Sequence, residues 1–141
     1  MKSIIGKSLI EELLPQKAPF TMADKLFSFK ENNIIAGLTV SGDNIFVEGN
    51  NFTEPGIIEH MAQSVALYTA YGYHLKNETA PVGYIGSIKT AKIMQLPVVG
   101  DELVTEVSVL QEFMGITLVN IVTKINEAVV ATSQMKTVLA Q

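Results

Sequence analysis

The pattern of apolar and polar residues predicts a chain of two strands, one long helix and four further strands. Segments such as LVTEVSVL and ITLVNIVTKI combine partial alternation with many β-branched residues, which is typical of strands. We expect strands at residues 20–30, 34–40, 82–95, 102–113, 116–126 and 128–139. The INEA sequence between the last two strands predicts a tight hairpin turn.

Shorter elements lie before the long helix. Residues 8–14 predict a short helix that ends at Pro15, because the proline ring cannot continue a helix. The segment IFVEGNNF, residues 45–52, predicts a short extended stretch that leads into a loop.

The long helix is predicted to begin near Glu54 and to end at about Leu75. Thr53 is the N-cap candidate, and a proline is tolerated in the first turn of a helix. The helix is apolar on nearly every side, which is typical of a buried helix. It also carries three polar residues near its start, Glu59, His60 and Gln63, and buried carboxylates are rare unless they are paired or functional.

Three alanines in this helix, Ala62, Ala66 and Ala70, repeat every four residues and form a smooth stripe. We expect a sheet to pack closely against that stripe. Strands, then one buried helix, then a run of strands predict an α+β fold in which an antiparallel sheet curls around the helix. Residues 1–141 are therefore expected to form a single domain.

Composition adds two expectations. Hydrophobic residues make up 48% of the chain and charged residues 17%, with a mean hydropathy of +0.29. Part of this apolar excess is expected to cover an oligomer interface or to line a channel for an apolar ligand. The net charge is −4 and Lys and Arg do not cluster, so nucleic-acid binding is not expected.

Other classes of protein are disfavoured by what the sequence lacks. There are no cysteines, which excludes disulfides and a thiol nucleophile. The N-terminus has no signal-peptide pattern, and no run is long enough to span a membrane, so a cytoplasmic location is expected. His60 and His74 are the only histidines and no acidic cluster has ligand spacing, so no metal site is expected.

Glu59 is the strongest candidate for chemistry. Glu59 and Gln63 are four residues apart and share a helix face, whereas His60 is rotated by about 100° from Glu59. The helix dipole favours the charged form of Glu59 and burial favours the neutral form, as suits a proton donor or base. The alternative is that Glu59 only bonds backbone N–H groups and that His60 is a hydrogen-bonded structural residue.

Three motifs resemble those of bacterial 3-hydroxyacyl-[acyl carrier protein] dehydratases of the FabZ and FabA type. ELLPQKAPFTMADKL resembles the family's opening segment of ELLP, PF and an Asp followed by a basic residue. IEHMAQ resembles its helix motif, with Glu59 at the acidic position. SIKTAKI and LPVVGDEL resemble its I-x-x-A-R-F strand and the P-V-x-P-G-D turn that follows. The chain looks closest to the branch found in aryl polyene and flexirubin-type pigment clusters.

The resemblance implies a hotdog fold, an antiparallel sheet wrapped around a long central helix. It also implies a homodimer or a higher homo-oligomer, with one continuous sheet across the dimer and active sites between subunits. The expected partner is an acyl chain carried on acyl carrier protein, and no cofactor is expected. One feature departs from the family: Asn50 and Asn51 stand where a G-H-F-P-G loop carries a catalytic histidine, and an asparagine side chain cannot take a proton near neutral pH.

The leading functional prediction is a dehydratase that acts on a 3-hydroxyacyl thioester. The resemblance implies that Glu59 protonates the departing hydroxyl and that Gln63 positions Glu59 or binds the hydroxyl. Backbone N–H groups around Gly56 and Ile57 are expected to polarise the thioester carbonyl. The base is left open between His60 and Glu59 acting through a water.

Two alternatives remain at this point. A hotdog thioesterase needs only the Glu59 carboxylate with amide side chains, which Asn50, Asn51 and Gln63 would supply. A non-catalytic subunit would bind the acyl chain, or pair with an active dehydratase, without a histidine of its own.

Overall fold

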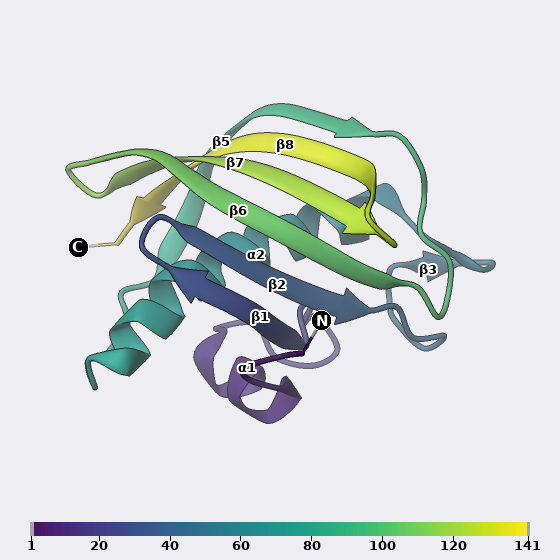
Figure 1. The fold of residues 1–141 in the computed structure, drawn as a ribbon, viewed down its shortest axis with the longest axis horizontal. Helices are drawn as coiled ribbons and strands as arrows, with labels where there is room; N and C mark the ends of the chain where they lie inside the picture. Colours follow the sequence, from purple (N-terminus) through teal and green to yellow (C-terminus); the bar gives the residue numbers. More distant parts are fainter. Residues whose placement is uncertain (1, 141) are drawn as a thin grey trace.

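A computed structural model describes residues 2–140. Its main feature is a six-stranded antiparallel sheet of order β1-β2-β6-β7-β8-β5, which curves over helix α2 (Figure 1). The strands of this sheet are β1 (Lys25–Lys30), β2 (Asn33–Thr39), β5 (Gly83–Ile93), β6 (Glu102–Phe113), β7 (Ile116–Ile125) and β8 (Ala128–Leu139). The helices are α1 (Lys7–Leu13) and α2 (Glu54–Leu75), and a small hairpin joins β3 (Val47–Glu48) to β4 (Asn51–Phe52).

Local sequence explains the three tight hairpins of the sheet. The β7–β8 turn consists of Asn126 and Glu127, both with positive φ, and the β6–β7 turn of Met114 and Gly115 has the same property. Two central residues with positive φ match the right-handed twist of the flanking strands. The predicted INEA hairpin is thus confirmed. In the third hairpin, Asn32, also with positive φ, lies in the turn between β1 and β2.

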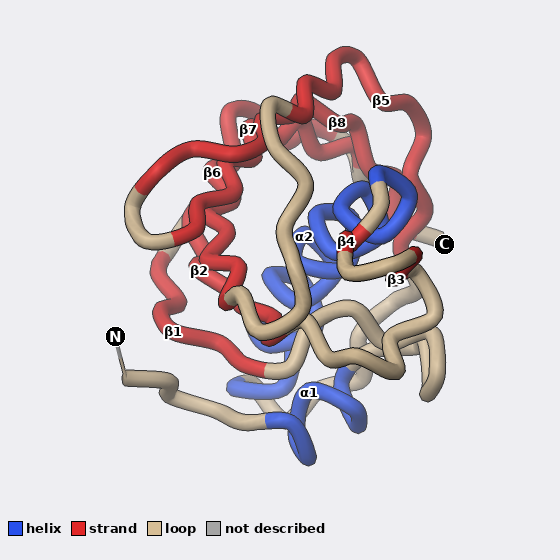
Figure 2. The backbone as a smooth tube through the Cα atoms, turned by 90° about the vertical axis from the view of Figure 1, so that its right-hand side faces the viewer, coloured by secondary structure: helices blue, strands red, loops and turns tan. Residues whose placement is uncertain are grey.

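Helix α2 has the bounds that the sequence predicts, Glu54–Leu75, with Thr53 at the N-cap position. The Thr53 hydroxyl does not cap the helix, because it donates to the Phe46 carbonyl at 2.6 Å. Figure 2 shows α2 lying inside the curve of the sheet, with loops closing the other side. The main core is formed by buried residues of α2 and of β1, β2, β6, β7 and β8, together with Ile10 and Leu14 of the N-terminal segment.

The first strand is shorter than predicted. Residues 20–24 do not join the sheet as strand, and β1 begins at Lys25. The reason is that side chains of α2 bind the backbone here: Met22 N–H donates to Gln63 Oε1 at 2.6 Å, and the Met22 carbonyl lies 2.7 Å from His60 Nδ1. These bonds hold residues 20–22 against the helix.

The two edges of the sheet differ. The N-terminal segment partly covers β1, because Ile4 N–H donates to the Leu26 carbonyl at 2.7 Å and Ile5 bridges Leu26. Strand β5 pairs with β8 on one side only, and its residues are exposed up to Ile93. The described residues contain no helix long and apolar enough to cross a membrane. The sheet wrapped around a central helix is the hotdog arrangement, and the fold prediction is confirmed.

Candidate active site

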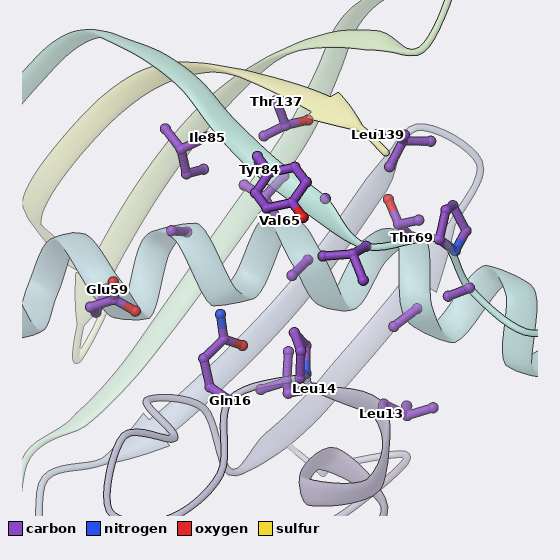
Figure 3. A pocket seen from close by; sticks show the side chains of 18 of the residues that line it. Leu13, Leu14, Gln16, Glu59, Val65, Thr69, Tyr84, Ile85, Thr137 and Leu139 are labelled. Atoms are coloured by element: carbon purple, nitrogen blue, oxygen red, sulfur yellow. The ribbon is translucent and has the colours of Figure 1, made fainter. Parts of the chain in front are cut away.

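A groove of about 440 Å³ runs along one face of α2 (Figure 3). Its walls come from the segment after α1 and from the start of β5, with the end of β8 closing one end. The groove residues on α2 are Glu59, Ala62, Val65, Ala66, Thr69 and Ala70. Facing residues include Leu13, Leu14, Gln16, Pro81, Val82, Tyr84, Ile85 and Leu139. The groove is therefore mostly apolar, with the Glu59 carboxylate at one end.

The alanine stripe has a different neighbour from the one predicted. Ala62 and Ala66 are partly exposed and line the groove, and Ala70 lies further along the same wall. The face of α2 that is buried under the sheet carries larger or polar residues, including His60, which bonds to Thr105 of β6. The small side chains thus leave open space beside the helix instead of drawing the sheet close.

Glu59 and Gln63 lie together, as their spacing predicts. Gln63 Nε2 donates to Glu59 Oε2 at 2.9 Å. The Gln63 amide is almost fully buried, since Nε2 also donates to the Phe20 carbonyl at 2.9 Å and Oε1 accepts from Met22 N–H. Each amide atom faces a backbone group of fixed polarity, so the orientation of the Gln63 amide is determined. Gln63 therefore holds Glu59 Oε2, and Glu59 Oε1 has no bonded partner within residues 2–140.

His60 points away from the groove and is fully buried. Its Nδ1 lies 2.7 Å from the Met22 carbonyl, which can only accept, so Nδ1 carries the hydrogen. Nε2 therefore accepts from the Thr105 hydroxyl at 2.7 Å, and Thr105 in turn accepts from Thr123 at 2.7 Å. Burial lowers the pKa of His60 to about 4. This geometry favours the structural alternative for His60, a neutral link between α2 and the sheet.

Asn50 and Asn51 lie in the β3–β4 hairpin, and both are exposed. Gly49 turns the chain with a φ of 63°, and the Asn50 carbonyl accepts from Val99 N–H at 3.1 Å. Neither asparagine lines the groove that contains Glu59 of the same chain. Within one protomer the structure does not bring these two residues to the carboxylate.

Gly56 and Ile57 also lie outside the groove. Gly56 packs against Phe46 and Phe52, and a Cβ there would come within 2.7 Å of their side chains, so packing alone requires a glycine. The Ile57 side chain is fully buried in the core, and its N–H donates to the Thr53 carbonyl at 3.2 Å. The Ile57 N–H is therefore occupied within the helix and does not face a substrate in this groove.

Sequence reasoning missed several groove residues. Gln16 points across the groove towards α2 in Figure 3, and its Oε1 is buried without a hydrogen-bond partner in the described chain. Tyr84 and Leu139 come from strands distant in sequence, and only the fold brings them here. Thr69 could have been found, because it follows Ala62 by seven residues, two turns of helix, and so lies on the face of the alanine stripe. Residues 2–140 contain no group of three or more His, Cys, Asp or Glu side chains able to hold a metal ion.

Comparison with known proteins identifies the family. Residues 8–141 match the ApeP-like family, described as ApeP dehydratase. This chain belongs to the ApeP-like dehydratase family. The ApeP-like chain is 34% identical over 139 residues to a protein of Vibrio atlanticus (strain LGP32) named 3-hydroxyacyl-[acyl-carrier-protein] dehydratase FabZ. The matched region covers 90% of this chain and 88% of the relative. The FabZ of Vibrio cholerae serotype O1 is 34% identical over 147 residues, covering 96% of this chain and 92% of that protein.

A solved structure shares the ApeP-like fold. It is "The Dehydratase Heterocomplex ApeI:P from Xenorhabdus doucetiae", of which one chain matches with a TM-score of 0.80 and 16% identity. The match covers 94% of this chain and 91% of that chain. At this identity the likeness shows the hotdog fold, and the family assignment rests on the sequence matches.

Proposed function

We propose that this protein removes water from a 3-hydroxyacyl thioester carried on acyl carrier protein, in fatty-acid or polyene-type biosynthesis. The observation that carries the proposal is the Glu59 carboxylate, held by Gln63 at one end of an apolar groove. The similarity to FabZ proteins supports the substrate class. Carrier-protein docking is proposed near the exposed Lys89 and Lys92 of β5.

We further propose that Glu59 acts as both base and acid. Glu59 Oε1 takes the proton from C2 of the substrate, and the C2–H electron pair forms the C2=C3 double bond. The C3–O bond breaks, and the proton returns from Glu59 to the departing hydroxyl, which leaves as water. Glu59 ends as the carboxylate that began the cycle, so no second titrating group is needed.

The choice of Glu59 alone follows from the position of the histidines. Protonation of His60 would break its bond from Thr105 and place a charge in the core, and its lowered pKa expresses that cost. His74 is exposed and stacks on Tyr71 near the other end of α2. Two carboxylates line the groove, Glu12 and Glu59, and Glu59 is the one on α2 that Gln63 holds. Gln16 is the neutral hydrogen-bonding side chain opposite the helix.

We propose a homodimer through β5. This strand is 11 residues long and has one unpaired edge, with the apolar side chains of Tyr84, Ile85 and Ile88 at least 40% exposed. Bare, apolar edge strands pair readily with another strand. Pairing two copies of β5 would continue the sheet and close the groove. It would also place the partner's β3–β4 hairpin, which carries the two asparagines, near Glu59.

A second candidate is the catalytic or acyl-binding subunit of a heteromeric dehydratase. Two observations favour it: no histidine lines the groove in residues 2–140, and the structurally similar Xenorhabdus doucetiae chain belongs to a complex of two dehydratase proteins. In that arrangement a second hotdog protein would supply the base, and this chain would supply Glu59 and the acyl groove.

Mass spectrometry of 3-hydroxyacyl-carrier-protein substrates tests these proposals. We expect the wild type to release one water, and Glu59→Gln to lose at least about 100-fold in rate, since an amide cannot transfer the proton. A Gln111→Glu variant, at an exposed position of β6, is the control for a change of side-chain charge and should keep full turnover.

The other products separate the alternatives. Release of the free acid would contradict the dehydratase and support a thioesterase. Loss of water only after a histidine-containing hotdog dehydratase is added, and then only with intact Glu59, would support the heteromeric subunit.

A further inference from the structure

A second cavity, of about 720 Å³, lies beyond the groove at the C-terminal end of α2. Four aromatic side chains contribute to its walls, Phe29, Tyr68, Tyr73 and Phe113. Phe29 and Tyr68 pack with their ring centroids 5.6 Å apart. The cavity is thus rich in aromatic and aliphatic side chains, with Glu31, Lys76 and Glu112 also at its walls. It lies on the same helix that presents Glu59.

Two residues, Thr69 and Leu139, line both cavities. Figure 3 shows their side chains together at one end of the groove, and Glu59 at the opposite end. Thr69 lies on α2, and Leu139 is the last residue of β8. Because both side chains line both cavities, they lie between the groove and the aromatic cavity.

We propose that Thr69 and Leu139 form a partition that limits the length of the bound acyl chain. The proposal deepens the function given above and rests on it, since it takes the groove to hold the substrate's acyl chain. It adds two specificity-determining residues and a limit on chain length.

Helix geometry sets the limit. Thr69 follows Glu59 by ten residues, and at 1.5 Å per residue the two lie roughly 15 Å apart along the helix axis. An extended chain of single bonds advances roughly 1.2 Å per bond, as an extended backbone does. The groove therefore holds roughly 12 carbons beyond the reacting end before the chain meets the partition.

The partition is built on secondary structure. Leu139 N–H donates to the Gly115 carbonyl at 3.0 Å, and Leu139 pairs with Gly83 across the β5–β8 ladder. A Cβ at Gly83 would lie 3.6 Å from Leu139 Cδ2, so the leucine side chain rests directly over this glycine. A wall that is bonded on both sides can stop a chain end, whereas a free loop would move aside.

Chain-length binding tests the partition without relying on catalysis. Saturated acyl thioesters on carrier protein cannot lose water, and their dissociation constants can be measured for a series that spans the roughly 12-carbon limit. For the wild type we expect affinity to rise roughly fourfold per added carbon up to the limit and then to stop rising. In the Thr69→Ala, Leu139→Ala double variant the rise should continue by several carbons as the two cavities join.

Two further variants keep the test decisive. Thr69→Met enlarges the partition and should lower the limit by a few carbons, which also guards against a double variant that does not fold. Leu75→Ala trims a residue that lines only the second cavity and should leave the limit unchanged. The same limit in all variants, or no limit in the wild type, would overturn the partition even if the chain proves to be a dehydratase. If the chain-length limit shifts as expected in these variants but the protein removes no water, the partition is supported and the proposed dehydratase activity is refuted.

Discussion

At the scale of single residues, neighbouring positions on α2 have opposite environments. Glu59 is partly exposed in the groove, and the next residue, His60, is fully buried under the sheet. Gln63 links the two regions, because its amide binds both the Glu59 carboxylate and the backbone of Met22, whose carbonyl binds His60. A substitution at Gln63 would therefore disturb the carboxylate and the packing of residues 20–22 together.

The buried His60 predicts a specific loss of stability in acid. Its pKa is about 4 in the folded protein against 6.5 for an ordinary histidine, because burial disfavours the charged form. The unfolded chain therefore binds the extra proton first as the pH falls. The His60 contribution to stability is complete above pH 6.5 and is lost progressively down to about pH 4, a change of about 3 kcal/mol.

Urea unfolding of wild type and His60→Gln across this pH range measures the effect. The free energy of unfolding should fall with acid more steeply in the wild type, and the difference between the two proteins isolates the histidine from the carboxylates. Asp24 and Lys25 are the charged groups that act on His60, so Asp24→Asn is the companion variant. Equal slopes in wild type and His60→Gln would contradict the buried neutral imidazole.

At the scale of elements, the sheet has one covered edge and one bare edge. The N-terminal segment bonds to β1 at Leu26, whereas the outer edge of the 11-residue strand β5, opposite β8, has no strand beside it in residues 2–140. This asymmetry is the reason that β5, and not β1, is the proposed dimer edge.

A charge on β5 should separate the subunits. We expect Ile88→Lys to convert a dimer to a monomer at micromolar concentration, because Ile88 is 45% exposed on the bare strand and an unpaired charge there would be desolvated on association. Val129→Lys is the matched control, since this valine is 43% exposed but lies on β8. Light scattering measures the molar mass, and so the oligomeric state, of both variants. A wild type that is monomeric, or an Ile88→Lys dimer as stable as wild type, would refute the β5 interface.

At the scale of the whole molecule, one protomer does not assemble every predicted site residue. Asn50 and Asn51 lie in a hairpin outside the groove of their own chain. The proposed dimer makes a site from Glu59 of one chain and the asparagines of its partner, so the catalytic unit would be the pair.

Subunit mixing tests that arrangement. Glu59→Gln chains and Asn50→Ala, Asn51→Ala chains should each be inactive as homodimers. Mixed dimers contain one site with an intact carboxylate and intact asparagines, so random mixing should restore roughly a quarter of wild-type activity. If mixing restores no activity, Glu59 and the asparagines act within one chain. If the asparagine variant is fully active by itself, Asn50 and Asn51 have no role in the site.

The sequence by itself was sufficient for features that depend on near neighbours in the chain. The period of the apolar residues located α2 and the four C-terminal strands, and INEA specified a hairpin because a two-residue turn needs positive φ at both residues. The contact between Glu59 and Gln63 also follows from helix geometry, since residues four apart share a face.

Tertiary structure decided what each face meets. Periodicity shows that Ala62 and Ala66 share a helix face, but only the packed sheet shows that this face borders a groove. It also turned residues 20–24 from a predicted strand into a segment bound by Gln63 and His60, because side chains of α2 took the backbone bonds of Met22. The meeting of Thr69 with Leu139 depends on contacts between distant segments, and such contacts leave no periodic signal in the chain.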